Sequence, residues 1–350
     1  MISMLVQALY NVVDSMFVAQ INENALTAVS LAFPIQNLMI AVSTGTGVGI
    51  NALLSRSLGA RDYESANRAA TNGLFVMILS SIPFILFGLF GANAFMRAQT
   101  DIAEIVEYGT EYLRVVCMLS VGIFGQIAFE RLLQSTGRAT LSMFTQGIGA
   151  ILNIVLDPIL IFKLGMGVRG AALATIVSQG VSCLWVVLFL FSKKSVLKLR
   201  VQNFLQSPRL ILPCVGLGTA TFIMQTSESV LSVCFNSSLA RYGGDIAVGA
   251  MTILTSVMQF ALLPLQGISQ GAQPILSYNY GAKNVERVRK TFRVLLTVCL
   301  TYSALIWAFV MPCPRVFAGI FTPDAELIEF TGRALRIYCA VLAIFGIQQA

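Results

Sequence analysis

The sequence contains no histidine, and only 11% of its 350 residues are charged. Without histidine it offers no imidazole to a metal ion and no Ser-His or Cys-His nucleophile pair. The shortage of charge excludes an ordinary soluble domain of this length, because such domains carry about 25% charged residues. We therefore predict a protein that is not an enzyme and has no organic or metal cofactor.

Paired cysteines are lacking as well. None of the seven cysteines forms a C-x-x-C pair, and nearly all of them lie within apolar segments, so we interpret them as packing residues. The formal net charge is +7, but no platform of aromatic and basic residues accompanies it. Nucleic acid is therefore not a predicted partner.

Apolar sequence is what the chain has in abundance. Hydrophobic residues make up 56% of it, and its mean hydropathy is +0.79. Runs of about 20 apolar residues, the length that crosses a bilayer core, recur throughout. Turn residues and charges separate ten predicted spans: about 1–20, 25–54, 68–93, 107–135, 139–162, 168–192, 209–240, 246–278, 291–314 and 328–350. This pattern predicts an all-α, multi-pass integral membrane protein surrounded by lipid.

Basic residues are distributed unequally between the two alternating sets of loops. One set, which includes Arg61 and Lys283, holds 15 basic residues, whereas the other, which includes Arg241 and Arg315, holds five. Basic loops stay in the cytoplasm, so the first span runs from inside to outside. The linker at 193–208 is then cytoplasmic.

The chain also repeats itself at an offset of 222 residues. Gly49–Ala60 pairs with Gly271–Ala282 in one register through a loop, and Glu107 pairs with Glu329. One copy holds six spans, an even number, so the two copies enter the membrane in the same direction, as parallel repeats do. We predict an N-terminal six-helix lobe at 1–200 and a C-terminal lobe at 201–350 that holds only its first four helices. The ends fall within apolar segments, which indicates truncation at both ends.

Charged residues inside a membrane are costly and usually mark function. Asp14 lies in the first span and Asp157 in the fifth, and Tyr10 and Asn153 precede them by four residues, a spacing that shares one helix face. Each aspartate lies about six residues from the outer end of its span, and Thr175 in the sixth span lies about seven residues from that edge. Three helices thus present oxygen atoms at one depth.

These oxygens suit a hard cation. Pro158 cannot donate to the helix ladder, so it frees a carbonyl near Ile154 as a further ligand. The group can hold Na⁺ at Asp14 and Asp157, or one carboxyl can carry a proton. The alternative is that each aspartate only bonds to a neighbouring helix. Against this, the repeat partner of Asp14 is Asn236, so packing does not demand an acid in both copies.

The seventh span carries a further acid, Glu228, three residues after Gln225. We interpret it as part of a substrate site or second cation site, with an acid bonded between helices as the alternative. Gln259 in the eighth span either lines a pathway or joins helices. Glu130 lies beside Arg131 at the cytoplasmic end of the fourth span, and we interpret this as a boundary ion pair.

Together these residues resemble a known family, the multidrug and toxic compound extrusion (MATE) family. The resemblance rests on Tyr10-x-x-x-Asp14, Asn153-x-x-x-Asp157-Pro158, Thr175 and the Gly-Ala loops at 59–60 and 281–282, and covers essentially the whole chain. It implies twelve helices in two lobes around a central cavity. It also implies export of cationic or amphipathic compounds, driven by Na⁺ or H⁺ entry at Tyr10, Asp14, Asn153, Asp157 and Thr175. Glu228 resembles an acid that some members carry on the first helix of the second lobe.

The alternative function is a flippase for a lipid-linked oligosaccharide or cell-wall precursor. Such a pathway must hold a polyanionic pyrophosphate and needs basic residues, whereas the charges found at membrane depth are mainly acidic. We therefore favour a cation-coupled antiporter for multidrug efflux. We expect it to act as a monomer in the cell membrane, and specifically in a bacterial inner membrane.

Overall fold

A computed structural model describes residues 6, 13–14, 16–18, 20–191, 197, 208–321 and 325–350. Within these ranges every regular element is a helix, which confirms the all-α prediction. The chain divides into two compact units, one ending at Met224 and the other comprising Gln225–Ala350. This division falls inside a helix, and the boundary predicted at 200/201 falls among residues outside the described ranges.

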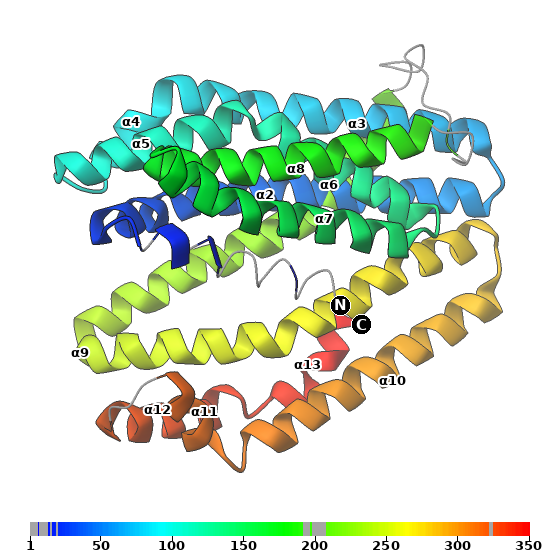
Figure 1. The fold of residues 1–350 in the computed structure, drawn as a ribbon. Helices are drawn as coiled ribbons and strands as arrows, with labels where there is room; N and C mark the ends of the chain where they lie inside the picture. Colours follow the sequence, from blue (N-terminus) through cyan, green and yellow to red (C-terminus); the bar gives the residue numbers. More distant parts are fainter. Residues whose placement is uncertain are drawn as a thin grey trace. The chain divides into compact units, whose positions relative to one another are not determined.

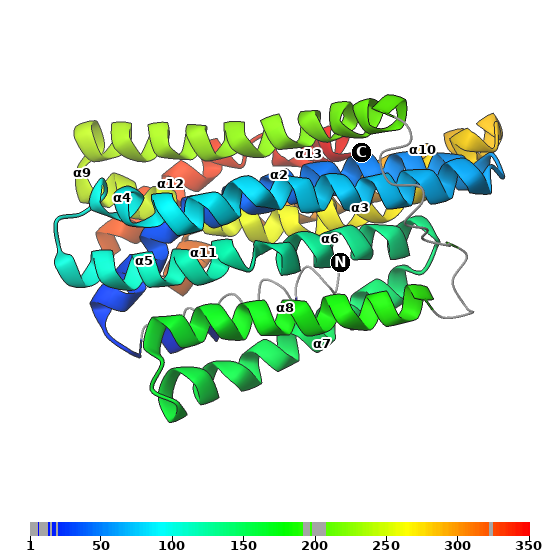
Figure 2. The same cartoon turned by 90° about the horizontal axis from the view of Figure 1, so that it is seen from above.

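The first unit is a bundle of helices that lie alongside one another (Figures 1 and 2). Its elements are α2 (Glu23–Gly59), α3 (Tyr63–Leu86), η1 (Phe87–Gly91), α4 (Ala92–Arg97), α5 (Ala103–Met118), α6 (Ser120–Ser135), α7 (Ala139–Pro158), η2 (Ile159–Lys163) and α8 (Gly167–Phe191). The two η elements are π-helical turns. Helix α2 packs against α3, α5 and α6, while α7 packs against α8.

The interior of this bundle is apolar, and so is much of its surface. Tyr112, Phe124 and Leu132 are almost fully buried in one continuous core. Large apolar side chains also remain exposed, and Phe90 and Phe144 expose 80% and 63% of their surface. An apolar exterior of this extent is costly in water and favourable in lipid, so the surface agrees with a multi-pass membrane protein.

The second unit contains the later part of α9 and the helices after it. Its elements are α9 (Pro208–Gly281) from Gln225 onward, α10 (Val285–Val310), α11 (Pro314–Phe321), α12 (Ala325–Tyr338) and α13 (Leu342–Gln349), whereas the start of α9 belongs to the first unit. Figure 1 shows α9 turning back on itself, so that it forms two arms running in opposite directions. Helix α10 packs against α13, and α11 packs against α12.

The structure confirms the internal duplication. Four pairs of helices start at the same 222-residue offset: α3 and α10, α4 and α11, α5 and α12, and α6 and α13. Both copies are also bent at the equivalent break, by 47° between α5 and α6 and by 50° between α12 and α13. The shared bend shows that the copies repeat this break as well as their helices.

The first loop of each copy shows the same correspondence in atomic detail. Arg61 and Lys283 both adopt the left-handed backbone conformation, with φ of 60° and 56°. Asp62 and Asn284 then cap the following helix, each accepting a hydrogen bond from the backbone N–H three residues later, at 2.9 Å and 3.0 Å. The hydrogen bonds from Ser65 hold the pKa of Asp62 below its ordinary value.

Six helices among the described residues are long and apolar enough to cross a membrane, and eight segments qualify if each bent pair counts as one span. These eight correspond to eight of the ten predicted spans. The predicted span at 1–20 lies largely outside the described residues. The one predicted at 209–240 is the first arm of α9, which is not among the eight.

Candidate functional site

The fifth and sixth predicted spans meet through the polar residues that the sequence singles out. Asn153 and Asp157 are both buried on α7, exposing 2% and 0% of their surface. The Asn153 amide lies 3.4 Å from Asp157 Oδ1 and 3.4 Å from Thr175 Oγ1 on α8, both long for hydrogen bonds. The Thr175 hydroxyl donates to the Ala171 carbonyl at 3.2 Å. The structure thus brings these three predicted residues together.

Asp14 joins this group from the first predicted span. Its carboxyl group lies within hydrogen-bonding range of the Asp157 carboxyl group. Two carboxylates cannot bond to each other unless a proton or a cation lies between them. Asp14 Oδ1, Asn153 Oδ1 and Asp157 Oδ2 are buried and have no hydrogen-bond partner among the described residues. Three unpartnered acceptors at one place are costly, and a bound proton or cation removes that cost.

Helix α7 changes its winding directly after Asp157. The α-helix ends at Pro158 and continues as the π-helical turn η2, in which Leu164 N–H donates to the Ile159 carbonyl at 2.9 Å. Pro158 has no N–H to give the Ile154 carbonyl, in line with the prediction of a freed carbonyl nearby. Gly170 of α8 accommodates η2, since a Cβ atom there would lie 2.7 Å from the Leu160 backbone.

The remaining predicted site residues are distributed differently. Tyr10 lies outside the described residues. Gln225, Glu228 and Gln259 all lie on α9, where Gln225 is half-buried and the other two are exposed. In the described part of the chain, no group of three or more Cys, Asp and Glu side chains could hold a metal ion. A cation at Asp14 and Asp157 would therefore need amide, hydroxyl or carbonyl oxygens as its further ligands.

The prediction that Glu130 forms a boundary ion pair misses its main contacts. Glu130 is buried, and its Oε1 accepts hydrogen bonds from Gln134 at 3.1 Å, from Ser142 at 2.9 Å and from Gln146. Ser142 and Gln146 belong to α7, so the acid connects α6 to the helix that carries Asp157. Arg131 is also buried, and it donates to Gln134 Oε1 at 3.0 Å.

Two copies of one helical unit, with many apolar side chains on the outside and two acids brought together within the first copy, define a multi-pass membrane protein of the duplicated-bundle type that transporters use. The model of the MatE family matches residues 1–159 and 220–350. The chain therefore belongs to the MatE family, whose members are transporters and not enzymes.

Curated relatives and solved structures match over nearly the whole chain. Multidrug export protein MepA of Staphylococcus haemolyticus (strain JCSC1435) is 24% identical, with 99% of this chain and 76% of the relative covered. MepA of Staphylococcus aureus (strain NCTC 8325 / PS 47) is also 24% identical, with coverage of 99% and 77%. These values establish a distant relationship that extends from one end of the chain to the other.

Two solved structures are similar at 28% identity, and 99% of this chain is covered in both. One is the outward-facing conformation of a multidrug resistance MATE family transporter of the MOP superfamily, with a TM-score of 0.92 and 78% of that chain covered. The other is a MOP superfamily transporter from Pyrococcus furiosus Vc1 (DSM3638), with a TM-score of 0.89 and 77% covered. The fold is therefore that of a MATE transporter.

Proposed function

We propose that this protein is an antiporter that exports cationic or amphipathic small molecules in exchange for Na⁺ or H⁺, as a monomer in a bacterial inner membrane. The observation that carries the proposal is the pair of facing carboxyl groups on Asp14 and Asp157, with buried, unpartnered oxygens beside them. The curated relatives are multidrug export proteins, which supports a drug as the exported molecule.

The site couples entry of the cation to export of the drug through charge. Without a proton or cation, the carboxylates repel each other in a low-dielectric interior, and this favours separation of the segments that carry them. A cation or proton between them removes the repulsion and draws Asp14 toward α7. If this rearrangement weakens drug binding by about 1–3 kcal/mol, the bound cation lowers the affinity for drug five- to 150-fold. Bound drug must then lower the affinity for the cation by the same factor.

Purified protein in vesicles tests this under an imposed Na⁺ gradient and, separately, under an imposed pH gradient. Asp14→Asn and Asp157→Asn should each abolish gradient-driven drug efflux. Drug binding to the unmutated protein should weaken as Na⁺ or H⁺ rises, and the same titration should be flat in both variants. Glu64→Gln is the matched control, because Glu64 is a surface acid of the same unit that pairs with Arg68.

The double variant separates one shared site from two independent ones. Residues that act as a unit are not additive, so the double variant should lose little more than either single variant. Efflux that survives in both single variants, or competition between cation and drug that persists in them, would place coupling elsewhere.

A further inference from the structure

Helix α7 carries a line of polar side chains that extends well beyond the acidic pair. Ser142, Gln146, Asn153 and Asp157 follow one another at intervals of four, seven and four residues, which places them on one face of the helix. At 1.5 Å per residue this line is about 22 Å long, most of the thickness of a bilayer core. Ser142, Asn153 and Asp157 are buried, so the line faces the interior of the bundle.

The end of the line remote from Asp157 meets the polar cluster around Glu130. Ser142 and Gln146 both donate to Glu130 Oε1, and Gln134 lies 3.3 Å from the Ser142 hydroxyl. The hydroxyl of Ser135, also on α6, lies 2.7 Å from Asn51 Oδ1 on α2. Three helices therefore contribute to a hydrogen-bonded cluster beside the 136–138 loop, which the distribution of basic residues assigns to the cytoplasm.

Between the two ends, α8 lines the interior with further polar atoms. A Cβ atom at Gly149 would lie 2.5 Å from Ser182 Oγ, so the missing side chain lets polar groups of α8 approach α7. Ser178 exposes 1% of its surface, and its hydroxyl oxygen has no hydrogen-bond partner among the described residues. Gln146 Oε1 and Gln179 Oε1 are likewise buried and unpartnered. Buried polar atoms of this kind normally bind water or an ion.

We propose that this polar face of α7, with Glu130 and Gln146 at its inner end, is the path by which the coupling cation leaves the Asp14–Asp157 site for the cytoplasm. The proposal rests on the proposed function, because that function identifies the Asp14–Asp157 pair, at the outer end of the polar face, as the coupling site. The side-chain oxygens of Glu130, Ser142 and Gln146 replace part of the hydration shell of the cation as it passes. Hydroxyl groups and water in the same line would conduct a proton.

Transport kinetics test the path with two variants. Gln146→Leu and Glu130→Gln should each lower the turnover of gradient-driven efflux about tenfold, which corresponds to about 1.4 kcal/mol on the rate-limiting barrier. The half-saturating drug concentration and the competition between cation and drug at equilibrium should not change, because the Asp14–Asp157 site is intact in both variants. Gln36→Leu is the control, since it removes one interhelical hydrogen bond, to Tyr112 at 2.8 Å, away from the path.

The kinetic outcomes distinguish a path for the cation from a purely structural role of these residues. If either variant loses turnover together with the cation–drug competition, the residues only hold α7 in place and the proposal is wrong. Unchanged turnover in both variants also overturns it. Vesicles driven by a Na⁺ gradient alone or by a pH gradient alone show which cation uses the path. Only with the gradient of the coupling ion will the variants lower turnover.

A second measurement does not depend on transport, so it separates this proposal from failure of the proposed function. In a cysteine-free background, Ser178→Cys should react with Ag⁺ supplied from the cytoplasmic side, and adding Gln146→Leu should slow the reaction about tenfold. Ser81→Cys is the control, because Ser81 is fully buried on α3 and bonds to the Ile78 carbonyl. A Ser178→Cys rate no faster than that of Ser81→Cys would exclude a water-filled path.

Discussion

Glu228 differs from the acids of the first unit in its surroundings. Asp157 is fully buried, whereas Glu228 is exposed on the first arm of α9. An exposed carboxylate attracts a cation by about 0.2–1 kcal/mol, which is enough to favour a cationic drug without holding it rigidly. We propose that Glu228, with Gln225 and Gln259 on the same helix, contacts the exported molecule.

Removing this charge should therefore change selectivity more than activity. Glu228→Gln should raise the half-saturating concentration of cationic drugs about two- to fivefold and leave that of neutral drugs unchanged. Vesicle efflux with one cationic and one neutral drug measures the difference. Glu326→Gln, an exposed acid of the same unit, should alter neither. An equal loss for both drugs would show that Glu228 has only a structural role.

At the residue scale, the sequence predicts contacts that arise within one helix better than contacts between helices. Asn153 and Asp157 are four residues apart, and helical geometry alone places them on one face. Thr175 was predictable from its depth in the membrane. The partners of Glu130 were not, because Ser142 and Gln146 lie on the next helix and only the packed structure brings α6 and α7 together.

At the scale of single elements, hydrophobic periodicity located the helices and missed changes of winding within them. Pro158 predicted an interruption near Asp157, and the structure shows the π-helical turn η2 directly after it. The turn η1 in the third predicted span begins four residues after Pro83, so the proline that precedes it is less direct as a signal. A π-helical turn is as apolar as the α-helix around it, so the hydrophobic pattern does not reveal which carbonyl accepts from which N–H. The packing of the helices decides that.

Glycine governs how closely two elements of the first unit approach. A Cβ atom at Gly218 of α9 would lie 2.5 Å from the Gly45 carbonyl oxygen of α2, so any side chain must push the two backbones apart. Gly218→Val should lower the free energy of unfolding by about 1–3 kcal/mol. Thermal unfolding of the purified protein in detergent measures the loss.

The same helix supplies a control two residues away. Gly216 is exposed, and a Cβ atom there would meet nothing within 4 Å. Gly216→Val should leave the unfolding temperature unchanged or raise it slightly, because glycine is a poor helix former. Equal destabilisation by both variants would mean that helix propensity or bilayer contacts decide the effect and close packing does not.

At the scale of the whole molecule, the duplication was the most informative feature of the sequence. Its 222-residue offset anticipated the matching helix starts, the matching bends and the matching loop conformations at Arg61 and Lys283. The division between the compact units was not anticipated, because it falls inside α9 and no composition change marks it.

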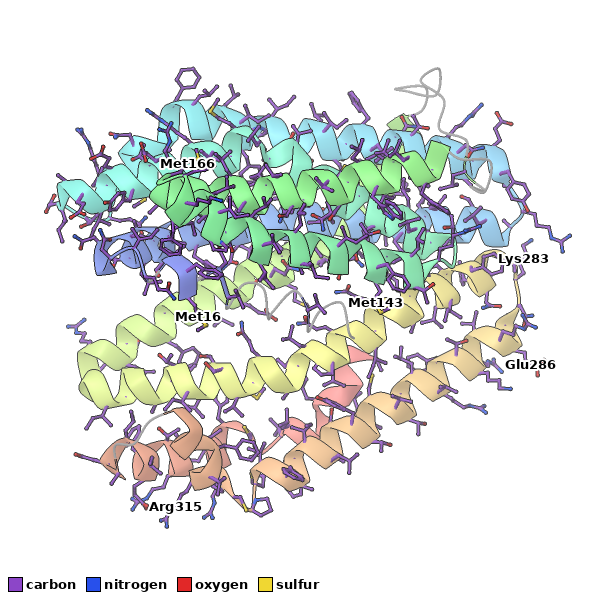
Figure 3. The ribbon with its side chains drawn as sticks, in the orientation of Figure 1. Met16, Met143, Met166, Lys283, Glu286 and Arg315 are labelled. Atoms are coloured by element: carbon purple, nitrogen blue, oxygen red, sulfur yellow. The ribbon has the colours of Figure 1, made fainter. Side chains whose placement is uncertain are left out.

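Parallel repeats make a strict prediction about sidedness. If both copies enter the membrane in the same direction, the equivalent loops at Arg61 and Lys283 must lie on one side, which the distribution of basic residues assigns to the cytoplasm. Within the second unit, Lys283 and Arg315 lie at opposite ends (Figure 3). Arg315 should therefore face the outside.

Single cysteines placed at these three positions, in a background without the seven native cysteines, test both statements. An impermeant thiol reagent added to intact cells should label Arg315→Cys and leave Arg61→Cys and Lys283→Cys unlabelled, and inverted vesicles should give the opposite pattern. Arg61→Cys and Lys283→Cys labelled from opposite sides would refute parallel repeats. If they label together but from outside, the repeats are parallel and the assigned orientation is reversed, which would place the inner end of the α7 polar line, at Glu130, on the outer face.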